Sequence, residues 1–423
     1  MTKRTARVLT ASVVLALTIV GAAHSTASAG DGPSGATGSP ASAPKAGEVS
    51  VDRAQAAAVM RIVRAAMKED HLKAVIVRVT VDGKNLVTRA AGESMTGVPA
   101  TTAMHFRNGA VAIGYMANLL LQLVDEGTVS LDDKVSKWLP RLPHADKVTV
   151  EQLARMTSGY HDYVHSPAFI EGVYANPFRQ WTTLEKLALG VNEPLWYEPG
   201  TNWNYAHTNY VILGLIMERA TGRPLGQLLR TRVLEPLGLN NTVGWSTPHI
   251  PEPVLHAFSS ERREFLGIPE GTSFYEESSF WNPSWTIADG SIQTTNIYDL
   301  NTSAIALGTG ALLSPESGRA MISTDLRGFG GPEGSCENQC HQQWVKYSYG
   351  IGAVTTGNWV MQNPLFGGYS AVEAYLPSKK IAIAVAVTYA EDGFAPDGSP
   401  TNQADTLFRA IGAQLAPDDA PPQ

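Results

Sequence analysis

The chain has 423 residues, of which 43% are hydrophobic, so it is long enough to bury a large core. Its formal net charge is −7 and its isoelectric point is about 5.8. Charges of one sign do not gather in long runs, which argues against nucleic acid or an anionic membrane surface as a partner.

The first 49 residues have the composition of a targeting segment followed by a linker. A basic start, "MTKRTAR", precedes the apolar run "VLTASVVLALTIVGAA" and the small-residue site "ASA" that ends at Ala29. This order predicts a signal peptide over 1–29 and a secreted protein. An uncleaved anchor is less favoured, because a membrane span needs roughly 20 apolar residues. We therefore expect no stable membrane span after cleavage. Residues 30–49 are rich in Gly, Ser, Pro and Ala and predict a flexible linker.

The elements that follow suggest one folded domain over 50–416. Apolar residues at helical spacing predict a helix over 51–70, and alternation around "DGKN" predicts a hairpin. A helix is expected to start near Ala110, more strands over 357–390, and a last helix over 401–415. Strands at both ends around a helical middle predict an α/β (α+β) fold. Its antiparallel sheet would be built from both chain ends and flanked by helices, with a mainly helical inserted region. Residues 417–423 are expected to be a disordered tail.

The two cysteines, Cys336 and Cys340, stand in "GGPEGSCENQCHQQW". In an exported protein this spacing favours a short-range disulfide. His341 follows directly, but the group lacks a fourth ligand, so a metal site is the weaker interpretation. We expect neither a metal nor another cofactor.

Five blocks in order resemble the serine β-lactamase and DD-carboxypeptidase superfamily, in particular the branch of class C β-lactamases and related esterases. They are "EGTVSLDDKVSKWLP", "VTVEQLARMTSGYHDY", "YEPGTNWNYAHTNYVILGLIMERATG", "DGSIQTTNIYDL" and "GGYSAVEAYLPSKKIAIAVAV". The resemblance covers nearly the whole chain after residue 50 and implies the β-lactamase/transpeptidase-like fold.

The motif that carries the chemistry of that superfamily is altered in this sequence. The resemblance aligns "FRNGAVAI" with Phe-Arg-x-Gly-Ser-x-x-Lys, which puts Ala110 at the serine position and Ile113 at the lysine position. Neither side chain can attack a carbonyl or accept a proton. Acyl-serine hydrolysis is therefore not expected from this site.

The second and third motifs also depart from the pattern. The Tyr-x-Asn motif is "YAH", so Tyr205 is kept and His207 replaces the asparagine. Counting back from "GGYSA" puts Gln362 where the resemblance implies a basic residue, with Pro364 two residues later. Tyr205 and His207 are the candidate acid and base, since imidazole titrates near neutral pH. His207 bonded only to a neighbouring backbone group is the alternative.

Other polar and aromatic side chains are candidates for the same pocket. A relocated nucleophile at Ser158 or Ser291 is the less favoured interpretation, because both have structural roles in the resembling family. The predicted pocket-lining residues are Ala110, Ile113, Tyr160, His161, Trp281 and Gln362, and Asp162 and Trp285 are further candidates.

Three functional hypotheses remain open. The first is a secreted pseudoenzyme that binds a small molecule or cell-wall peptide. The second is a repurposed enzyme in which Tyr205 and His207 catalyse an isomerisation, elimination or cyclisation. The third is a residual hydrolase that uses a displaced nucleophile or an activated water. A pocket in which two or three titratable groups meet apolar walls would favour the second over the first.

Overall fold

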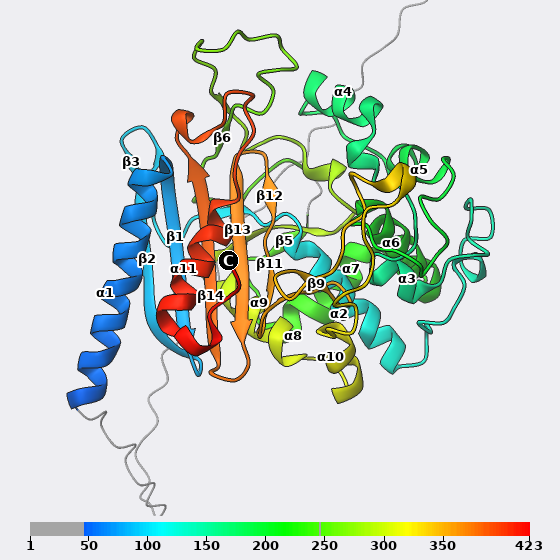
Figure 1. Ribbon diagram of the computed structural model, residues 1–423, viewed down its shortest axis with the longest axis horizontal. Coiled ribbons are helices and arrows are strands. Elements are labelled where there is room, and N and C mark those ends of the chain that lie inside the picture. Colours follow the sequence, from blue (N-terminus) through cyan, green and yellow to red (C-terminus); the bar gives the residue numbers. More distant parts are fainter. Residues whose placement is uncertain (1–45, 245–246) are drawn as a thin grey trace, which may run out of the picture. The chain divides into compact units, whose positions relative to one another are not determined.

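The computed structural model describes residues 46–244 and 247–423. The predicted signal peptide over 1–29 and most of the predicted linker lie outside these residues. Within them, nine strands form the main sheet, in the order β3-β2-β1-β14-β13-β11-β10-β9 with β12 beside β13 (Figure 1). All described strand pairs of this sheet are antiparallel.

The strands of the main sheet come from both ends of the described chain. They are β1 (Leu72–Val81), β2 (Lys84–Met95), β3 (Val98–Pro99), β9 (Ser348–Tyr349), β10 (Val354–Thr356), β11 (Trp359–Gln362), β12 (Leu365–Phe366), β13 (Tyr369–Leu376) and β14 (Ile381–Tyr389). Two smaller sheets contain β4 (His105–Arg107), β5 (Val243–Gly244) and β8 (Ile292–Asn296), and β6 (Phe258–Ser259) with β7 (Glu276–Glu277).

The α-helices lie mostly in the middle of the chain. They are α1 (Ala46–Glu69), α2 (Val111–Asp125), α3 (Val150–Ala154), α4 (Pro167–Ala175), α5 (Thr183–Val191), α6 (His207–Thr221), α7 (Leu225–Leu229), α8 (Glu235–Leu237), α9 (Ile297–Thr309), α10 (Pro315–Met321) and α11 (Gln403–Leu415). Single helical turns of the 3₁₀ type include η2 (Tyr163–His165), η4 (Pro283–Trp285), η5 (Gly334–Cys336) and η7 (Pro417–Asp419).

The hairpin and the pairing of the two chain ends follow from local chemistry. Asp82 and Gly83 take positive φ values of 48° and 73°, which suits the tight turn that joins β1 to β2. β1 pairs on its other side with β14, so the two ends of the domain share the centre of the sheet. The predicted fold class, hairpin and late strands are confirmed.

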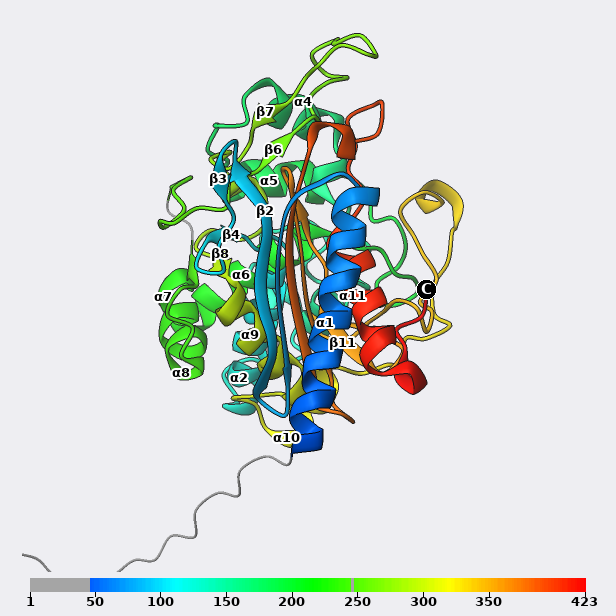
Figure 2. The same ribbon diagram turned by 90° about the vertical axis from the view of Figure 1, so that its left-hand side faces the viewer.

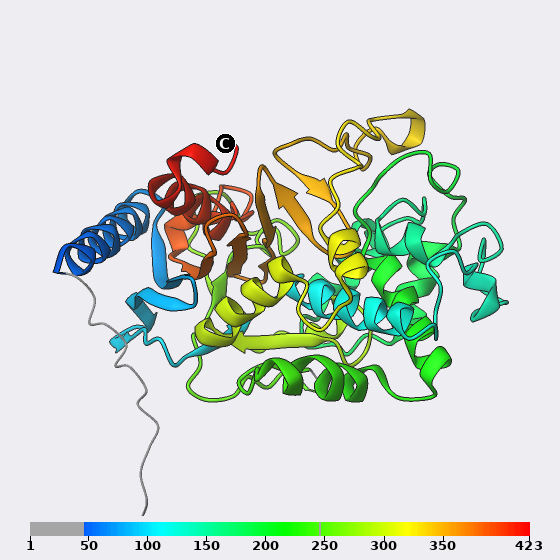
Figure 3. The same cartoon turned by 90° about the horizontal axis from the view of Figure 1, so that it is seen from below.

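Helices cover both faces of the sheet. α1 and α11 pack on one face, whereas α9 packs on the other (Figure 2). Every residue of β13 and β14 is buried, which explains the nearly continuous apolar run of "IAIAVAVTY". Seen from below, the helices between α2 and α8 gather beyond α9, away from α1 (Figure 3). This is the predicted helical insertion.

Two boundaries differ from the prediction. α1 begins at Ala46, within the stretch expected to be linker, and five residues before the predicted start. The C-terminal residues are ordered against the domain: the Trp359 indole Nε1 donates to the Asp419 carbonyl at 2.7 Å, and Asn358 donates to its carboxylate at 2.8 Å. The prediction of a disordered tail over 417–423 was wrong, because these hydrogen bonds involve partners remote in the sequence.

Among residues 46–244 and 247–423, the structure has no helix that is both long and apolar enough to cross a membrane.

Candidate functional site

The start of α2 forms the floor of a pocket. β4 pairs with β8 and leads through Asn108 and Gly109 to Ala110, the N-cap residue of α2. The Ala110 side chain offers no capping hydrogen bond. The first turn of α2 therefore presents a methyl group to the pocket.

Gly109 allows the opposite side of the pocket to approach α2 closely. A Cβ atom added at Gly109 would lie 2.6 Å from Cβ of Pro364, and its φ of 44° is a conformation that favours glycine. Pro364 lies between β11 and β12, so the floor of the pocket and the main sheet meet here. Proline also removes a backbone donor beside the pocket.

The N-terminus of α6 brings in the imidazole of His207. Its Nδ1 lies 2.9 Å from Oδ2 of Asp162, and its backbone N–H donates to Oδ1 of the same carboxylate at 3.1 Å. The Asp162 carboxylate therefore caps α6 from another segment, at the helix end that favours negative charge. The His207 side chain is 19% exposed and that of Asp162 is 3% exposed. His207 thus bonds to a carboxylate, not only to backbone.

This arrangement fixes the role of each imidazole nitrogen. A carboxylate only accepts hydrogen bonds, so Nδ1 of neutral His207 carries the proton that it donates to Asp162. The lone pair is then on Nε2 of a ring that lines the pocket. The pair can accept a proton at Nε2, and the carboxylate stabilises the imidazolium that results.

Tyr205 lies beside His207, with ring centroids 5.1 Å apart and the planes nearly perpendicular. Burial raises the pKa of Tyr205 well above its ordinary value of 10, and neighbouring Tyr347 and Asp162 act in the same direction. Tyr205 is therefore a neutral phenol at neutral pH. Its hydroxyl can donate a hydrogen bond, whereas Nε2 of His207 can accept one.

The pocket has a volume of about 250 Å³ and mainly apolar and aromatic walls. Trp285 and Phe366 stack on each other, with ring centroids 5.3 Å apart and planes 9° from parallel. The described residues that line the pocket are Gly109, Ala110, Tyr205, His207, Trp285, Thr286, Ile287, Tyr347, Gln362, Asn363, Pro364, Leu365 and Phe366. None of them is a serine, a cysteine, a lysine, an arginine or an acid. Thr286 supplies an aliphatic hydroxyl, which donates to the Pro283 carbonyl at 2.9 Å.

The structure brings together four of the predicted site residues: Ala110, Tyr205, His207 and Gln362. Gln362 is 2% exposed, and its Nε2 donates to the Gly352 carbonyl at 2.7 Å. Trp285, the second tryptophan of "FWNPSW", is also in the wall.

Four predicted pocket residues are not among those that line it. Ile113 is fully buried in α2, since its position one turn after Ala110 faces the core. Trp281 is also buried, against Gly367. Tyr160 donates its hydroxyl to the Pro143 carbonyl at 2.5 Å, and His161 stacks on Trp196 with ring centroids 3.8 Å apart. Of the three predicted residues after the turn at Ser158, namely Tyr160, His161 and Asp162, Asp162 is the one that bonds to His207.

Neither alternative nucleophile is available in this geometry. Ser158 is fully buried, and its hydroxyl donates to Asn209 Oδ1 at 2.6 Å. Ser291 is fully buried beside Gln293, whose Nε2 donates to the serine hydroxyl oxygen at 3.3 Å. Both serines have structural partners and lie outside the described pocket lining.

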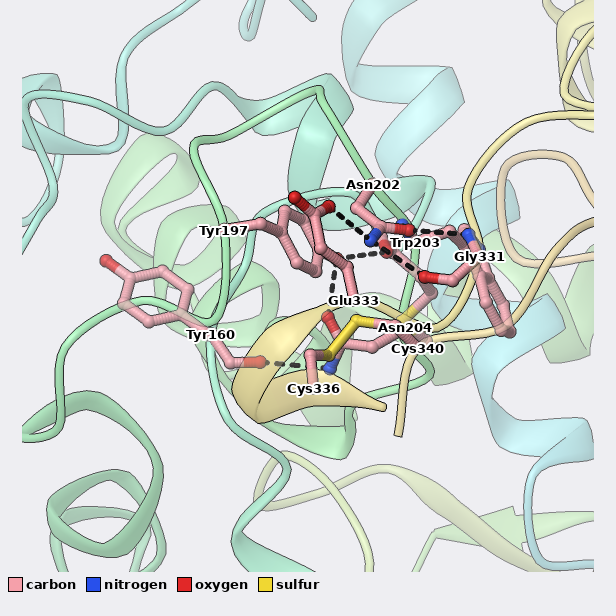
Figure 4. Close-up of a disulfide and its surroundings, with 10 residues drawn as sticks. Tyr160, Tyr197, Asn202, Trp203, Asn204, Gly331, Glu333, Cys336 and Cys340 are labelled. Carbon is pink, nitrogen blue, oxygen red and sulfur yellow. Dashed lines mark hydrogen bonds between the residues drawn. A yellow bond between two sulfur atoms is a disulfide. The ribbon is translucent and has the colours of Figure 1, made fainter. Parts of the chain in front are cut away.

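The predicted disulfide between Cys336 and Cys340 is confirmed. Its loop packs against the segment that leads to Tyr205 (Figure 4). Asn204 forms a β-bridge with Cys340, and Asn202 exchanges hydrogen bonds of 3.0 and 2.9 Å with the backbone of Gly331. The disulfide therefore supports the approach to α6 from outside the pocket.

Sequence reasoning missed several residues that build the site. Tyr347 and Thr286 come from loops without a recognisable motif, and Leu365 comes from the two-residue strand β12. Asp162 is a predicted candidate for the pocket, but the sequence does not predict its contact with His207, 45 residues later. The carboxylate of Asp162 directly follows "TSGYH" in the sequence, but no spacing rule connects it to the imidazole of His207.

A family model described as Beta-lactamase matches residues 59–408. Penicillin-binding protein 4* of Bacillus subtilis is 29% identical over 167 residues, which are 37% of this chain and 34% of the relative. The chain thus spans about a third of the length of that curated relative.

Solved structures match over a larger share of the chain. A D-stereospecific amidohydrolase from Streptomyces sp. has a TM-score of 0.67 at 25% identity, and the match covers 86% of this chain and 99% of that one. A D-amino acid amidase from Ochrobactrum anthropi SV3 has a TM-score of 0.68 at 19% identity, with 87% and 99% covered, which shows a shared fold. Because the family model matches more than half of its residues, this chain belongs to the Beta-lactamase family.

Proposed function

We propose that this chain binds a small, uncharged, amide-containing ligand with an apolar or aromatic group in the pocket. We further propose that His207 and Asp162 move a proton on that ligand without forming an acyl-enzyme. The reaction class is isomerisation, elimination or cyclisation.

One observation carries the proposal: the 2.9 Å contact between His207 Nδ1 and Asp162 Oδ2, with the imidazole in the pocket wall. A histidine that only fills space has no need of a buried carboxylate. With Tyr205 as a neutral donor 5.1 Å away, measured between ring centroids, an acid and a base face one apolar space. This favours the acid–base hypothesis over the purely binding one.

The lining supports the ligand class. The described lining residues include no Lys, Arg, Asp or Glu, so an ionic ligand would lose its hydration without gaining an opposite charge. Trp285 and Phe366 offer a large aromatic surface, while Gln362 and Asn363 are amides. The similar Streptomyces protein is a D-stereospecific amidohydrolase, which suggests amides as the first ligands to try.

The absence of an acyl-enzyme in this proposal rests on Ala110 and on the lack of a serine or cysteine among the described lining residues. Export is part of the proposal as well. The pattern over 1–29 supports it, and so does the Cys336–Cys340 disulfide, because cytosolic thiols normally stay reduced.

The experiment uses N-acetyl-phenylalanine amide in both the D and the L form, which is neutral, contains two amides and carries an aromatic ring. Calorimetry measures its affinity for the wild-type protein and for His207→Ala. Proton NMR in D₂O then reports any exchange, isomerisation, elimination or hydrolysis of the probe. We expect binding by both proteins and conversion by the wild type alone.

Each outcome is decisive for one part of the proposal. Binding without conversion would leave a pseudoenzyme and remove the acid–base role. Hydrolysis without a covalent adduct would assign His207 to the activation of water. Failure of both forms to bind would contradict the proposed ligand class.

A further inference from the structure

The wall of the pocket that carries Trp285 is held by two buried side chains that no motif predicts. The segment 284–287 presents four consecutive carbonyl groups, and all four accept hydrogen bonds from only two donors. Lys186 Nζ donates to the Ser284 carbonyl at 2.7 Å and also to the Ile287 carbonyl. The Tyr163 hydroxyl is shared between the Trp285 and Thr286 carbonyls, at 2.6 and 2.5 Å.

The buried ammonium group of Lys186 needs an acceptor for each of its three N–H groups. Lys186 projects from α5 and its side chain is fully buried, where an ammonium group is unfavourable unless its donors are satisfied. Its third donor meets Asp289 Oδ1 at 3.3 Å. Three acceptors for three N–H groups match a protonated amine. Because these acceptors bracket 284–287, the amine fixes both ends of the segment.

Tyr163 links the pocket wall that carries Trp285 to the segment that holds His207. It directly follows Asp162, whose carboxylate holds His207. The Tyr163 ring lies 6.1 Å from the His207 ring and 5.5 Å from Phe169, measured between centroids. One short stretch, Asp162 and Tyr163, therefore orients the imidazole and anchors the tryptophan that faces it.

We propose that Lys186 and Tyr163 are positioning residues that set the distance between the Trp285 wall and His207, and thereby the ligand that the pocket accepts. Trp285 is the wall residue that faces both sides of the site, 5.3 Å from Phe366 and 6.5 Å from His207 between ring centroids. The effect on ligand choice rests on the proposed function. The hydrogen bonds from Lys186 and Tyr163 to the carbonyl groups of 284–287, which we call the clamp, do not rest on it.

The first experiment needs no ligand. The protein is labelled with 5-fluorotryptophan, which gives one fluorine signal for each of its nine tryptophans, and Trp285→Phe assigns the signal of Trp285. Lys186→Met and Tyr163→Phe should each shift or broaden that signal. Hydrogen exchange of peptides that cover 283–291 should accelerate at least about tenfold, because the carbonyls lose their donors.

The matched control removes buried polar contacts elsewhere. Asn301 on α9 accepts from the Thr80 hydroxyl at 2.9 Å and donates to the Ala382 carbonyl at 3.2 Å. Asn301→Leu should leave the Trp285 signal and the exchange of 283–291 unchanged. If Lys186→Met does not fold, Tyr163→Phe decides alone, since it loses one hydroxyl and keeps its ring. An unchanged Trp285 signal in the folded clamp variants, or the same change in Asn301→Leu, would overturn the clamp.

The second experiment tests ligand choice with N-acetyl-phenylalanine amide. We expect its affinity to fall at least about fivefold in Tyr163→Phe and to stay unchanged in Asn301→Leu. If the wild type does not bind the probe, the proposed ligand class fails while the fluorine result for the clamp stands. If the wild type binds and Tyr163→Phe binds equally well, the clamp does not govern ligand choice.

Discussion

His207 Nδ1 and Asp162 Oδ2 lie 2.9 Å apart although 45 positions separate the two residues in the sequence. The same carboxylate accepts from the backbone N–H of His207 at 3.1 Å and of Val164 at 3.3 Å. Asp162 thus has two duties, to cap two helical segments and to hold one imidazole tautomer.

Asp162→Asn separates these duties. The amide oxygen can still accept from both backbone N–H groups, so we expect the fold to be retained. The amide nitrogen would face Nδ1 as a donor and move the imidazole proton to Nε2, which removes the base from the pocket. Turnover should fall by about 10²–10⁴, the usual scale for a positioned base. Nitrogen-15 NMR of histidine checks the tautomer, and an unchanged tautomer in Asp162→Asn would contradict this role.

A labelled penicillin should form no covalent adduct with the protein. Ala110 stands at the floor of the pocket, and the described lining contains no serine or cysteine that could be acylated. Mass spectrometry of the intact protein is the measurement, with a known serine β-lactamase as the positive control. A stoichiometric acyl adduct would show that a nucleophile outside this lining reaches the ligand.

Restoring Ala110→Ser and Ile113→Lys together should not produce efficient β-lactam turnover. Residue 113 is fully buried, so the new amine would enter the core and lower stability. His207, Gln362 and Pro364 would still stand in the other two motifs, and such groups act as a unit. We expect a folded but poorly active double variant. Turnover like that of a working β-lactamase would mean that these three positions are compatible with acylation.

The sequence predicts the elements of this fold better than it predicts the site. The hairpin at Asp82 and Gly83 and the apolar run of β14 are local signals, and both elements form where their patterns lie. The site depends on contacts between segments far apart, such as Asp162 with His207. Helical spacing puts Ile113 and Ala110 on one face of the helix and so predicts both in the pocket. Of the two, only Ala110 lines it.

The prediction of a disordered tail over 417–423 failed for a related reason. The residues over 417–423 are small and polar in composition, as in many loose ends. They are nevertheless held by Trp359 and by Arg409, which donates to the carbonyl of Pro422. Those partners are remote in the sequence, and composition alone does not reveal them.

The protein should contain no free thiol. Titration of the unreduced, denatured protein with a thiol reagent checks this, and two titrated thiols would refute the disulfide. Cys336→Ser with Cys340→Ser should lower the free energy of unfolding by at most about 2 kcal/mol, because the closed loop is short. Urea denaturation measures the loss. Exchange should rise at 202–204 as well as at 331–341, since Asn204 pairs with Cys340.

A buried acid behind the pocket should make stability depend on pH. Glu373 on β13 is 1% exposed, and its Oε2 has no hydrogen-bond partner among the described residues. It pairs across the strands with Gln362 of the pocket wall. Burial raises the pKa of Glu373 from 4.5 to about 8, an effect that a hydrogen bond from Ser303 only partly opposes.

The direction of the effect follows from proton uptake. Between about pH 4.5 and 8 the folded protein keeps the Glu373 proton, whereas the unfolded chain loses it. The free energy of unfolding that this group contributes is therefore complete below pH 4.5 and is lost as the pH rises through about 8. Glu373→Gln, which is always neutral, should lack this loss and be more stable than the wild type at pH 8.5, by on the order of a few kcal/mol. Near pH 4.5 the two proteins should differ little.

Urea denaturation of both proteins at pH 5 and pH 8.5 measures the difference. The exposed Glu171→Gln serves as the control for the loss of one carboxylate. If the stability difference between wild type and Glu373→Gln is the same at both pH values, while Glu171→Gln behaves like the wild type, then Glu373 is not a neutral buried acid. In that case the protonation of Glu373 would not differ between the folded and the unfolded protein from pH 5 to 8.5, and an ionised carboxylate would lie across from Gln362.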